Sequence, residues 1–172
     1  MSRLIAEPAP NSITPSGSPL TISKGRLLVA RVVSSPNFNE RPQGEDDIDL
    51  LVIHNVSLPP EQFGGDYIEH FFCNQLDENA HPYFKTIVDL QVSAHLLITR
   101  EGEIIQCVPF GARAWHAGRS YFNDREECND YSIGIELEGA DTIAYTDTQY
   151  RVLADVTHAI LHYYPRITKE RI

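Results

Sequence analysis

Cysteine, tryptophan, methionine and basic residues are all scarce in this sequence of 172 residues. It contains 3 cysteines, 1 tryptophan and 1 methionine, and its 14 Lys and Arg residues are outnumbered by 24 Asp and Glu residues. The cysteines, Cys73, Cys107 and Cys128, are odd in number and lack C-x-x-C spacing. A disulfide framework is therefore not expected, and a reducing compartment is favoured.

The formal net charge of −10 argues against two classes of partner. Nucleic-acid binding calls for clustered Lys and Arg, and an anionic membrane surface would repel so acidic a chain. The sequence also has no apolar run of about 18 residues, the length of a membrane span. Residues 1–24 lack the apolar core of a signal peptide. We therefore expect a cytoplasmic monomer that binds neither nucleic acid nor membrane.

The chain has the length of one domain that can bury a core. Residues 1–24 are rich in Pro, Ser and Thr, which predicts a disordered extension, with the folded domain at residues 25–172. Apolar runs predict strands at residues 26–33, 48–53, 92–99, 104–108 and 131–137, the third and fourth joined as a hairpin. With a short helix at residues 66–72, they indicate an α/β domain with a central sheet.

The clearest predicted helix follows Thr146. Thr146-x-x-Gln149 fits a capping box, and Pro165 ends the helix. Apolar residues recur at helical spacing and predict one buried face made of Tyr150, Leu153, Ala154, Thr157, Ile160, Leu161 and Tyr164.

Two residues carry the chemistry that the sequence suggests. His54 directly follows a buried strand, where a side chain emerges into a crevice, and neutral imidazole is the commonest metal ligand and suits zinc. A hydrogen-bonded structural histidine is the alternative. Glu136 alternates with Ile135 and Leu137 in a strand, so it faces away from them. A carboxylate there is costly unless it serves as a general base; a solvated acidic edge strand is the alternative.

Other aromatic and histidine residues give weaker indications. Trp115 precedes the small-residue turn His116-Ala-Gly118 and suits a wall for a sugar or peptide, although a core tryptophan with its N–H bonded is the commoner arrangement. His158 and His162 are four residues apart on the last helix but lack the Glu of H-E-x-x-H, so we expect half-exposed helix residues. For His95, ligand, supporting and core roles all stay open.

A series of motifs follows in order along the chain: Leu50–Pro60, Gln62–Gly65, Ala80–Phe84, Val92–His95, Gly102–Ile104, Val108–Phe110, Arg113–Gly118, Cys128–Asp130, Ser132–Gly139 and Ala144–Asp147. Taken together, these motifs resemble the AmpD-type 1,6-anhydro-N-acetylmuramyl-L-alanine amidases, a branch of the zinc amidases related to peptidoglycan recognition proteins. The resemblance implies a central mixed sheet flanked by helices and hydrolysis of the lactyl amide between N-acetylmuramic acid and L-alanine in cell-wall recycling.

The resemblance also implies roles for individual residues. His54 matches the first zinc ligand and Glu136 the catalytic acid/base, with Zn²⁺ as cofactor. Asn55, Tyr83 and Trp115 fall where relatives contact the anhydro-muropeptide.

This chain departs from its relatives in two respects. They continue past the last helix into a segment that supplies the second and third zinc ligands and a catalytic lysine, and the sequence ends at Ile172, where that segment is expected to begin. Two positions where relatives often carry Arg for substrate carboxylates hold Gln91 and Glu127, and Arg119 or Arg125 could compensate.

Three hypotheses follow. The first is a zinc amidase. The second is a muropeptide-binding module without catalysis, because the remaining ligands are missing while the groove residues are present. The third is that the sequence is a fragment of a longer amidase.

Overall fold

The computed structural model describes residues 19–172 and centres on a five-stranded mixed sheet. Most of the predicted extension, residues 1–18, lies outside the described residues, and strand pairing starts at Ile22. The strands are β1 (Ile22–Ser23), β2 (Arg26–Leu27), β3 (Arg31–Val32), β4 (Phe38–Asn39), β5 (Leu50–Val56), β6 (Leu96–Ile98), β7 (Ile104–Gln106), β8 (Arg113–Ala114), β9 (Tyr121–Phe122), β10 (Arg125–Glu126) and β11 (Ser132–Glu138). The α-helices are α1 (Tyr67–Phe72) and α2 (Asp147–Tyr163), and the 3-10 helices are η1 (Glu45–Asp47), η2 (Pro82–Thr86), η3 (Cys128–Asp130) and η4 (Lys169–Arg171).

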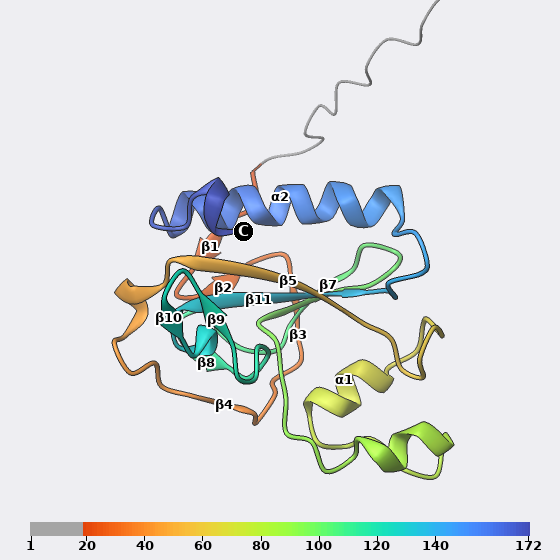
Figure 1. Ribbon diagram of the computed structural model, residues 1–172. Helices are drawn as coiled ribbons and strands as arrows, with labels where there is room; N and C mark the ends of the chain where they lie inside the picture. The colour runs from red at the N-terminus through yellow and green to blue at the C-terminus, as the bar shows by residue number, and fades with distance from the viewer. Residues whose placement is uncertain (1–18) are drawn as a thin grey trace, which may run out of the picture.

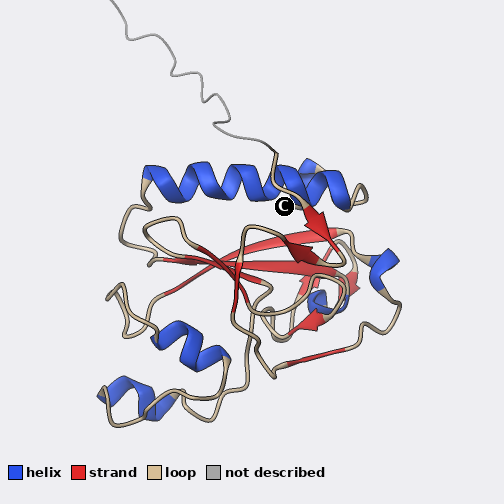
Figure 2. Ribbon diagram, turned by 180° about the vertical axis from the view of Figure 1, so that it is seen from behind, coloured by secondary structure: helices blue, strands red, loops and turns tan. Residues whose placement is uncertain are grey.

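The strand order of the central sheet is β3-β7-β6-β11-β5. Strand β11 runs parallel to both β5 and β6, β3 runs parallel to β7, and β6 pairs antiparallel with β7 as the predicted hairpin. Helix α2 covers one face of the sheet and α1 lies on the other side (Figures 1 and 2). The predicted α/β fold with a central mixed sheet flanked by helices is confirmed.

The two faces of the sheet have different chemistry. The face under α2 is an apolar core in which Ile133 and Ile135 pack with Val156 and Ile160 of the helix. Because side chains alternate in a strand, Ser132, Gly134, Glu136 and Glu138 of β11 point to the opposite face. The two-residue period of β11 thus places its apolar side chains under α2 and its polar side chains on the opposite face of the sheet.

Helix α2 begins with the predicted capping box. Thr146 Oγ1 accepts from Gln149 N–H (3.0 Å), and Gln149 Oε1 accepts from Thr146 N–H (3.1 Å). The buried face differs in part from the prediction, because Tyr150 is 56% exposed and Val156 and Ala159 are buried instead. The predicted and the observed buried faces of α2 both contain Ile160 and Tyr164, so the sequence is compatible with either. Packing of the helix on the sheet determines which face is buried.

Several predicted strands are shorter than their apolar runs. The run at residues 26–33 divides into β2 and β3 around an exposed turn that contains Leu28 and Val29. In the run at residues 92–99 only Leu96–Ile98 forms a strand; the backbone of His95 still bonds to Gly134 and Cys107, whereas Ser93 bonds to Asn37 and Trp115. Within residues 19–172, neither α-helix has the length and apolar character needed to cross a bilayer.

Candidate active site

His54 and Glu136 lie on neighbouring strands and face the same side of the sheet. They are register partners in the parallel pair β5–β11. Partners in register point the same way, so both side chains leave the face opposite α2. His54 lies inside β5 and not after it as predicted, because β5 continues to Val56. The structure therefore brings together the two residues that the sequence singled out for chemistry.

Glu136 is a buried carboxyl group in the middle of the sheet. Strand β11 is flanked by β5 and β6, so the alternative of a solvated edge strand is wrong. Its Oε2 atom is buried and has no hydrogen-bond partner among the described residues. Burial raises the pKa of Glu136 to about 8. A carboxyl group with a pKa near neutral can both hold and release a proton at physiological pH.

His116 is the residue at this site whose part the sequence did not reveal. Its Nδ1 atom lies 2.9 Å from Nε2 of His54. The ring packs on Gly134, where a Cβ atom would come within 2.4 Å of His116 Cγ. Burial and the nearby His95 hold the pKa of His116 well below its usual value. The Trp115–Gly118 motif marked the segment as functional, but only the folded structure directs His116 towards His54.

His95 is a fully buried core residue. Its Nδ1 atom accepts from Gly134 N–H (2.9 Å), and Nε2 lies 3.0 Å from the carbonyl oxygen of Ala112. Burial and the nearby guanidinium of Arg41 lower the pKa of His95 to about 3. His95 therefore stays neutral and fixes the backbone of β11 beside Glu136. Of the roles left open for it, the supporting one fits these contacts.

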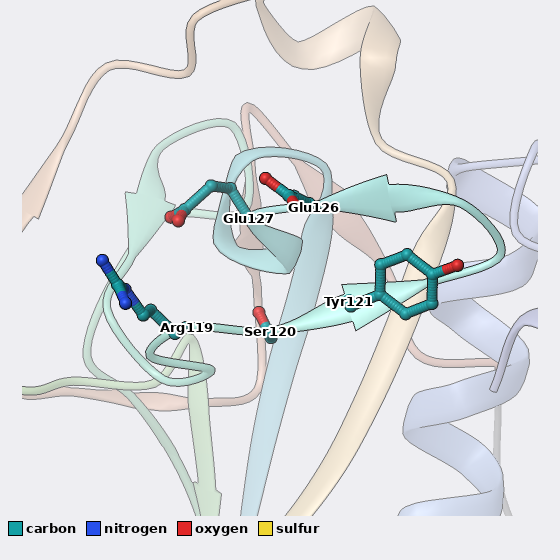
Figure 3. Close-up of a pocket in the computed structure, with 5 residues that line it drawn as sticks. All are labelled: Arg119, Ser120, Tyr121, Glu126 and Glu127. Atoms are coloured by element: carbon teal, nitrogen blue, oxygen red, sulfur yellow. The ribbon is translucent and has the colours of Figure 1, made fainter.

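A groove of about 780 Å³ runs along β5 and reaches His54 and His116. Glu136 does not line it. A second hollow of about 540 Å³ shares Ser120 and Tyr121 with this groove. Figure 3 shows Arg119 and Glu127 at one end of that hollow and Tyr121 at the other. A ligand seated near His54 can therefore extend towards a charged region.

The residues expected to contact substrate occupy separate positions. Asn55 follows His54 in β5, faces the other side of the sheet and donates to Asp141 Oδ1 (2.8 Å). Tyr83 lies on η2 and is 39% exposed. Trp115 follows β8, and its Nε1–H donates to Asn39 Oδ1 (2.7 Å).

Arg119 and Arg125, the two arginines considered as partners of a substrate carboxylate, differ in how far they are already engaged by other side chains. Arg125 is paired with Asp47 and lies over the Tyr131 ring, 3.8 Å from its centroid. Arg119 lines the second hollow, where Glu127 also lies. Arg119 is therefore the better placed of the two to receive a ligand.

The described residues supply only part of a zinc site. Catalytic zinc is held by three protein ligands and a water. Residues 19–172 contain no group of three His, Cys, Asp or Glu side chains placed to hold a metal. His158 and His162 are exposed on α2, as expected. His54 fits one ligand position, and the residues present do not complete the set.

The chain is similar to known proteins over most of its length. The family model "N-acetylmuramoyl-L-alanine amidase" matches residues 44–172. The chain is 56% identical over 148 residues to the 1,6-anhydro-N-acetylmuramyl-L-alanine amidase AmpD of Citrobacter freundii, covering 86% of this chain and 79% of that protein. AmpD of Escherichia coli K12 is 55% identical over 150 residues, with 87% and 81% covered.

Solved structures agree with these relatives. A crystal structure of a selenomethionine AmpD derivative matches with a TM-score of 0.83 and 55% identity, covering 86% of this chain and 82% of that one. AmpDH3 of Pseudomonas aeruginosa in complex with anhydromuramic pentapeptide matches with a TM-score of 0.52 and 26% identity, covering 73% and 49%. The resemblance seen in the sequence motifs is confirmed, and the chain belongs to the N-acetylmuramoyl-L-alanine amidase family.

Proposed function

We propose that this chain hydrolyses the amide bond between the lactyl group of 1,6-anhydro-N-acetylmuramic acid and L-alanine in muropeptides of cell-wall recycling. The observation that carries the proposal is Glu136, a buried carboxyl group beside His54 whose Oε2 atom has no hydrogen-bond partner within residues 19–172. The names of relatives more than half identical to the chain support the choice of substrate. The same proposal places the protein in the cytoplasm as a monomer.

Glu136 serves as the acid and base of the reaction. Its carboxylate accepts a proton from water as the water oxygen forms a bond to the lactyl carbonyl carbon. The carboxyl group then gives that proton to the alanine nitrogen as the carbon–nitrogen bond breaks. One water is consumed, and a lactyl carboxyl group and a free amine are released. A pKa of about 8 suits both transfers, because neither protonation state is strongly disfavoured near neutral pH.

Zinc is the proposed cofactor, with His54 as its candidate ligand in this chain. When bound, the metal lowers the pKa of a bound water towards about 7. No further step is assigned to it, because residues 19–172 do not bring three ligands together.

The groove along β5 is the proposed seat of the muropeptide. Tyr83 and Trp115 lie outside this groove and would offer aromatic surface to parts of the sugar or peptide that extend beyond it. Asn55 also lies outside the groove and would offer its amide only to a part of the ligand that passes the end of β5, once released from Asp141. Arg119 and Glu127 would meet charged groups of the stem peptide in the second hollow.

A second candidate function is a muropeptide-binding module without catalysis. One observation favours it, namely that no metal-holding trio occurs among the described residues. Calorimetry with an anhydro-muropeptide separates the two functions. Binding that is unaffected by chelator, with no cleavage product by mass spectrometry, would support the module and contradict the amidase.

The test of the amidase is product formation from anhydro-N-acetylmuramyl-tripeptide, with zinc added and with chelator. We expect free peptide with zinc and a rate lower by about 10²-fold or more in Glu136→Ala. Glu101→Gln, in the exposed turn after β6, is the matched control and should retain the full rate. A normal rate in Glu136→Ala would remove Glu136 from the reaction.

A further inference from the structure

We propose that Asn129 is a positioning residue whose side-chain oxygen fixes one wall of the substrate groove, and that Arg41 holds Asn129 in place. The groove wall is the segment of residues 115–117, of which His116 and Ala117 line the groove along β5. The role in ligand binding rests on the proposed function, because the ligand of this groove is taken to be the muropeptide.

Three successive backbone N–H groups of the groove wall donate to side-chain oxygens. Trp115 N–H donates to Ser93 Oγ (3.0 Å). The next two N–H groups, those of His116 (3.1 Å) and Ala117 (2.9 Å), both donate to Asn129 Oδ1. Backbone N–H groups that lie away from water need an acceptor, so the position of the acceptor fixes the path of the chain. Side chains of other segments therefore set where this wall stands.

Asn129 is the acceptor that serves two positions of the wall. It is a buried residue of η3. Both atoms that approach its side chain are backbone N–H donors, so the atom that they meet is the amide oxygen, whose two lone pairs take both bonds. Removal of this one oxygen would leave two successive N–H groups of the wall without their acceptor.

Arg41 fixes the backbone from which the Asn129 side chain projects. The Arg41 side chain is buried, and its guanidinium group has only donors. It donates to four backbone carbonyl oxygens, those of Asn129 (3.1 Å), Asp130 (3.0 Å), Phe110 (3.0 Å) and Ser132 (2.8 Å). These carbonyls belong to η3, to the turn before β8 and to the first residue of β11. One side chain thus ties η3 to the central sheet.

The groove wall lies against the site residue on β5. Nδ1 of His116 is 2.9 Å from Nε2 of His54. Glu136, in contrast, lies on β11 between two paired strands and does not line the groove. A shift of the wall should therefore weaken ligand binding more than it disturbs Glu136.

The test compares Asn129→Leu with the wild type as full chains. Leucine has a similar size but no acceptor, so KM for anhydro-N-acetylmuramyl-tripeptide should rise about 10-fold, with a smaller change in kcat. Hydrogen exchange of the His116 and Ala117 amides should also be faster by about 10-fold, whereas the amides of α2 should keep their rates. An unchanged KM, or unchanged exchange at both amides, would overturn the proposal.

Asn129→Asp separates positioning from a general loss of stability. Its carboxylate can accept the same two N–H bonds, and the guanidinium of Arg41 favours the charged form. KM and both exchange rates should lie within about 3-fold of the wild type. Asn79→Leu, in an exposed turn, is the matched control and should behave as the wild type. An aspartate variant as impaired as Asn129→Leu would contradict the role of the oxygen.

Two further variants keep the proposal testable if Asn129→Leu fails to fold. Asn129→Gln keeps the amide but moves its oxygen by one carbon–carbon bond, so the His116 and Ala117 amides should exchange faster. Arg41→Lys keeps the charge, but a single ammonium group cannot span four carbonyls, so the same amides should exchange faster with Asn129 intact. Wild-type exchange rates in both variants would overturn the proposal.

Failure of the proposed function has a different signature. If the wild type binds muropeptide without cleaving it, the Kd from calorimetry takes the place of KM in every comparison. A wild type that does not bind muropeptide contradicts the proposed function. Amide exchange is measured without ligand, so it still decides whether Asn129 holds the groove wall.

Discussion

Strand β11 carries two glutamates on the same face of the sheet, and their carboxyl groups have opposite environments. Glu138 is 4% exposed and fully engaged: Gly64 N–H donates to Oε1 (2.5 Å) and Arg100 N–H to Oε2 (2.9 Å). Glu136, two residues earlier, is also largely buried, yet its Oε2 has no partner in the described part of the chain. Glu138 thus holds two loops through hydrogen bonds, whereas Glu136 keeps a carboxyl oxygen available for chemistry.

The difference shows how a buried carboxyl group can be assigned a role. Both carboxyl oxygens of Glu138 accept backbone N–H groups, so this side chain holds two loops in place. A carboxyl group without such partners retains its proton to higher pH and can exchange it with a substrate. Hydrogen-bond partners, more than burial, therefore distinguish Glu136 from Glu138.

The largest expected effect is on turnover. Glu136→Gln keeps the size of the side chain but cannot carry the proton, so kcat should fall by about 10²–10⁴-fold. Glu138→Gln, its matched control, should change kcat by less than about 10-fold in the protein that remains folded. Steady-state hydrolysis of an anhydro-muropeptide measures both. Equal losses in the two variants would remove the distinction drawn between the glutamates.

The second effect is the pH dependence of unfolding in metal-free protein. The pKa of Glu136 is raised from 4.5 to about 8, so between these values the folded chain holds a proton that the unfolded chain has lost. The free energy of unfolding should therefore fall as pH rises from about 5 to 9, by roughly 2–4 kcal/mol. Chemical denaturation of the wild type and Glu136→Gln at several pH values tests this. The variant should lack the decrease, and a parallel decrease in both proteins would contradict the assignment.

His95 should add a slope of opposite sign at lower pH. Its pKa is lowered from 6.5 to about 3, so in this range the unfolded chain binds the extra proton. The free energy of unfolding should rise with pH from about 3 to 6.5. This rise in the free energy of unfolding at acid pH should be the same in Glu136→Gln and the wild type. It is therefore an internal control for the decrease expected at alkaline pH.

The third effect is on stability through Glu138. Glu138→Ala would leave the N–H groups of Gly64 and Arg100 without their acceptor, at an expected cost of about 2–4 kcal/mol. Thermal unfolding at neutral pH measures the loss. Glu136→Ala should lower the free energy of unfolding by less than this, or even raise it at pH 9, because none of the described residues forms a hydrogen bond with Oε2. A larger loss in Glu136→Ala than in Glu138→Ala at pH 9 would reverse the comparison.

The sequence predicts the elements of this site better than their contacts. The alternation of Ser132–Glu138 with buried Ile133 and Ile135 placed Glu136 on the polar face, because a strand has a fixed period of two. The contact between His54 and His116 spans 62 positions in sequence and depends on the packing of a loop, which no local pattern encodes. The hydrogen bonds of Glu138 are equally remote, so its structural part was not foreseen.

Strand limits were also less predictable than strand positions. The apolar run at residues 92–99 suggests a strand throughout, but β6 is confined to three residues. The backbone of His95 still bonds to Gly134 and Cys107, whereas Ser93 bonds to Asn37 and Trp115 in place of a sheet neighbour. Ser93 therefore lies beyond the limit of sheet pairing, which the apolar composition of the run does not reveal.

The smallest expected effect concerns the end of β11 that holds Glu138. Gln149 of the capping box donates from Nε2 to the carbonyl oxygen of Glu138 (2.9 Å), so the cap of α2 is tied to this end of the strand. Thr146→Ala removes one half of the box and should lower the free energy of unfolding by about 1 kcal/mol. The change lies away from Glu136, so the alkaline slope of stability should be unaltered. Thr146→Ser retains the hydroxyl group and is the control. A changed slope in Thr146→Ala would mean that the two ends of β11 are coupled, and that the environment of Glu136 depends on the same contacts that hold Glu138.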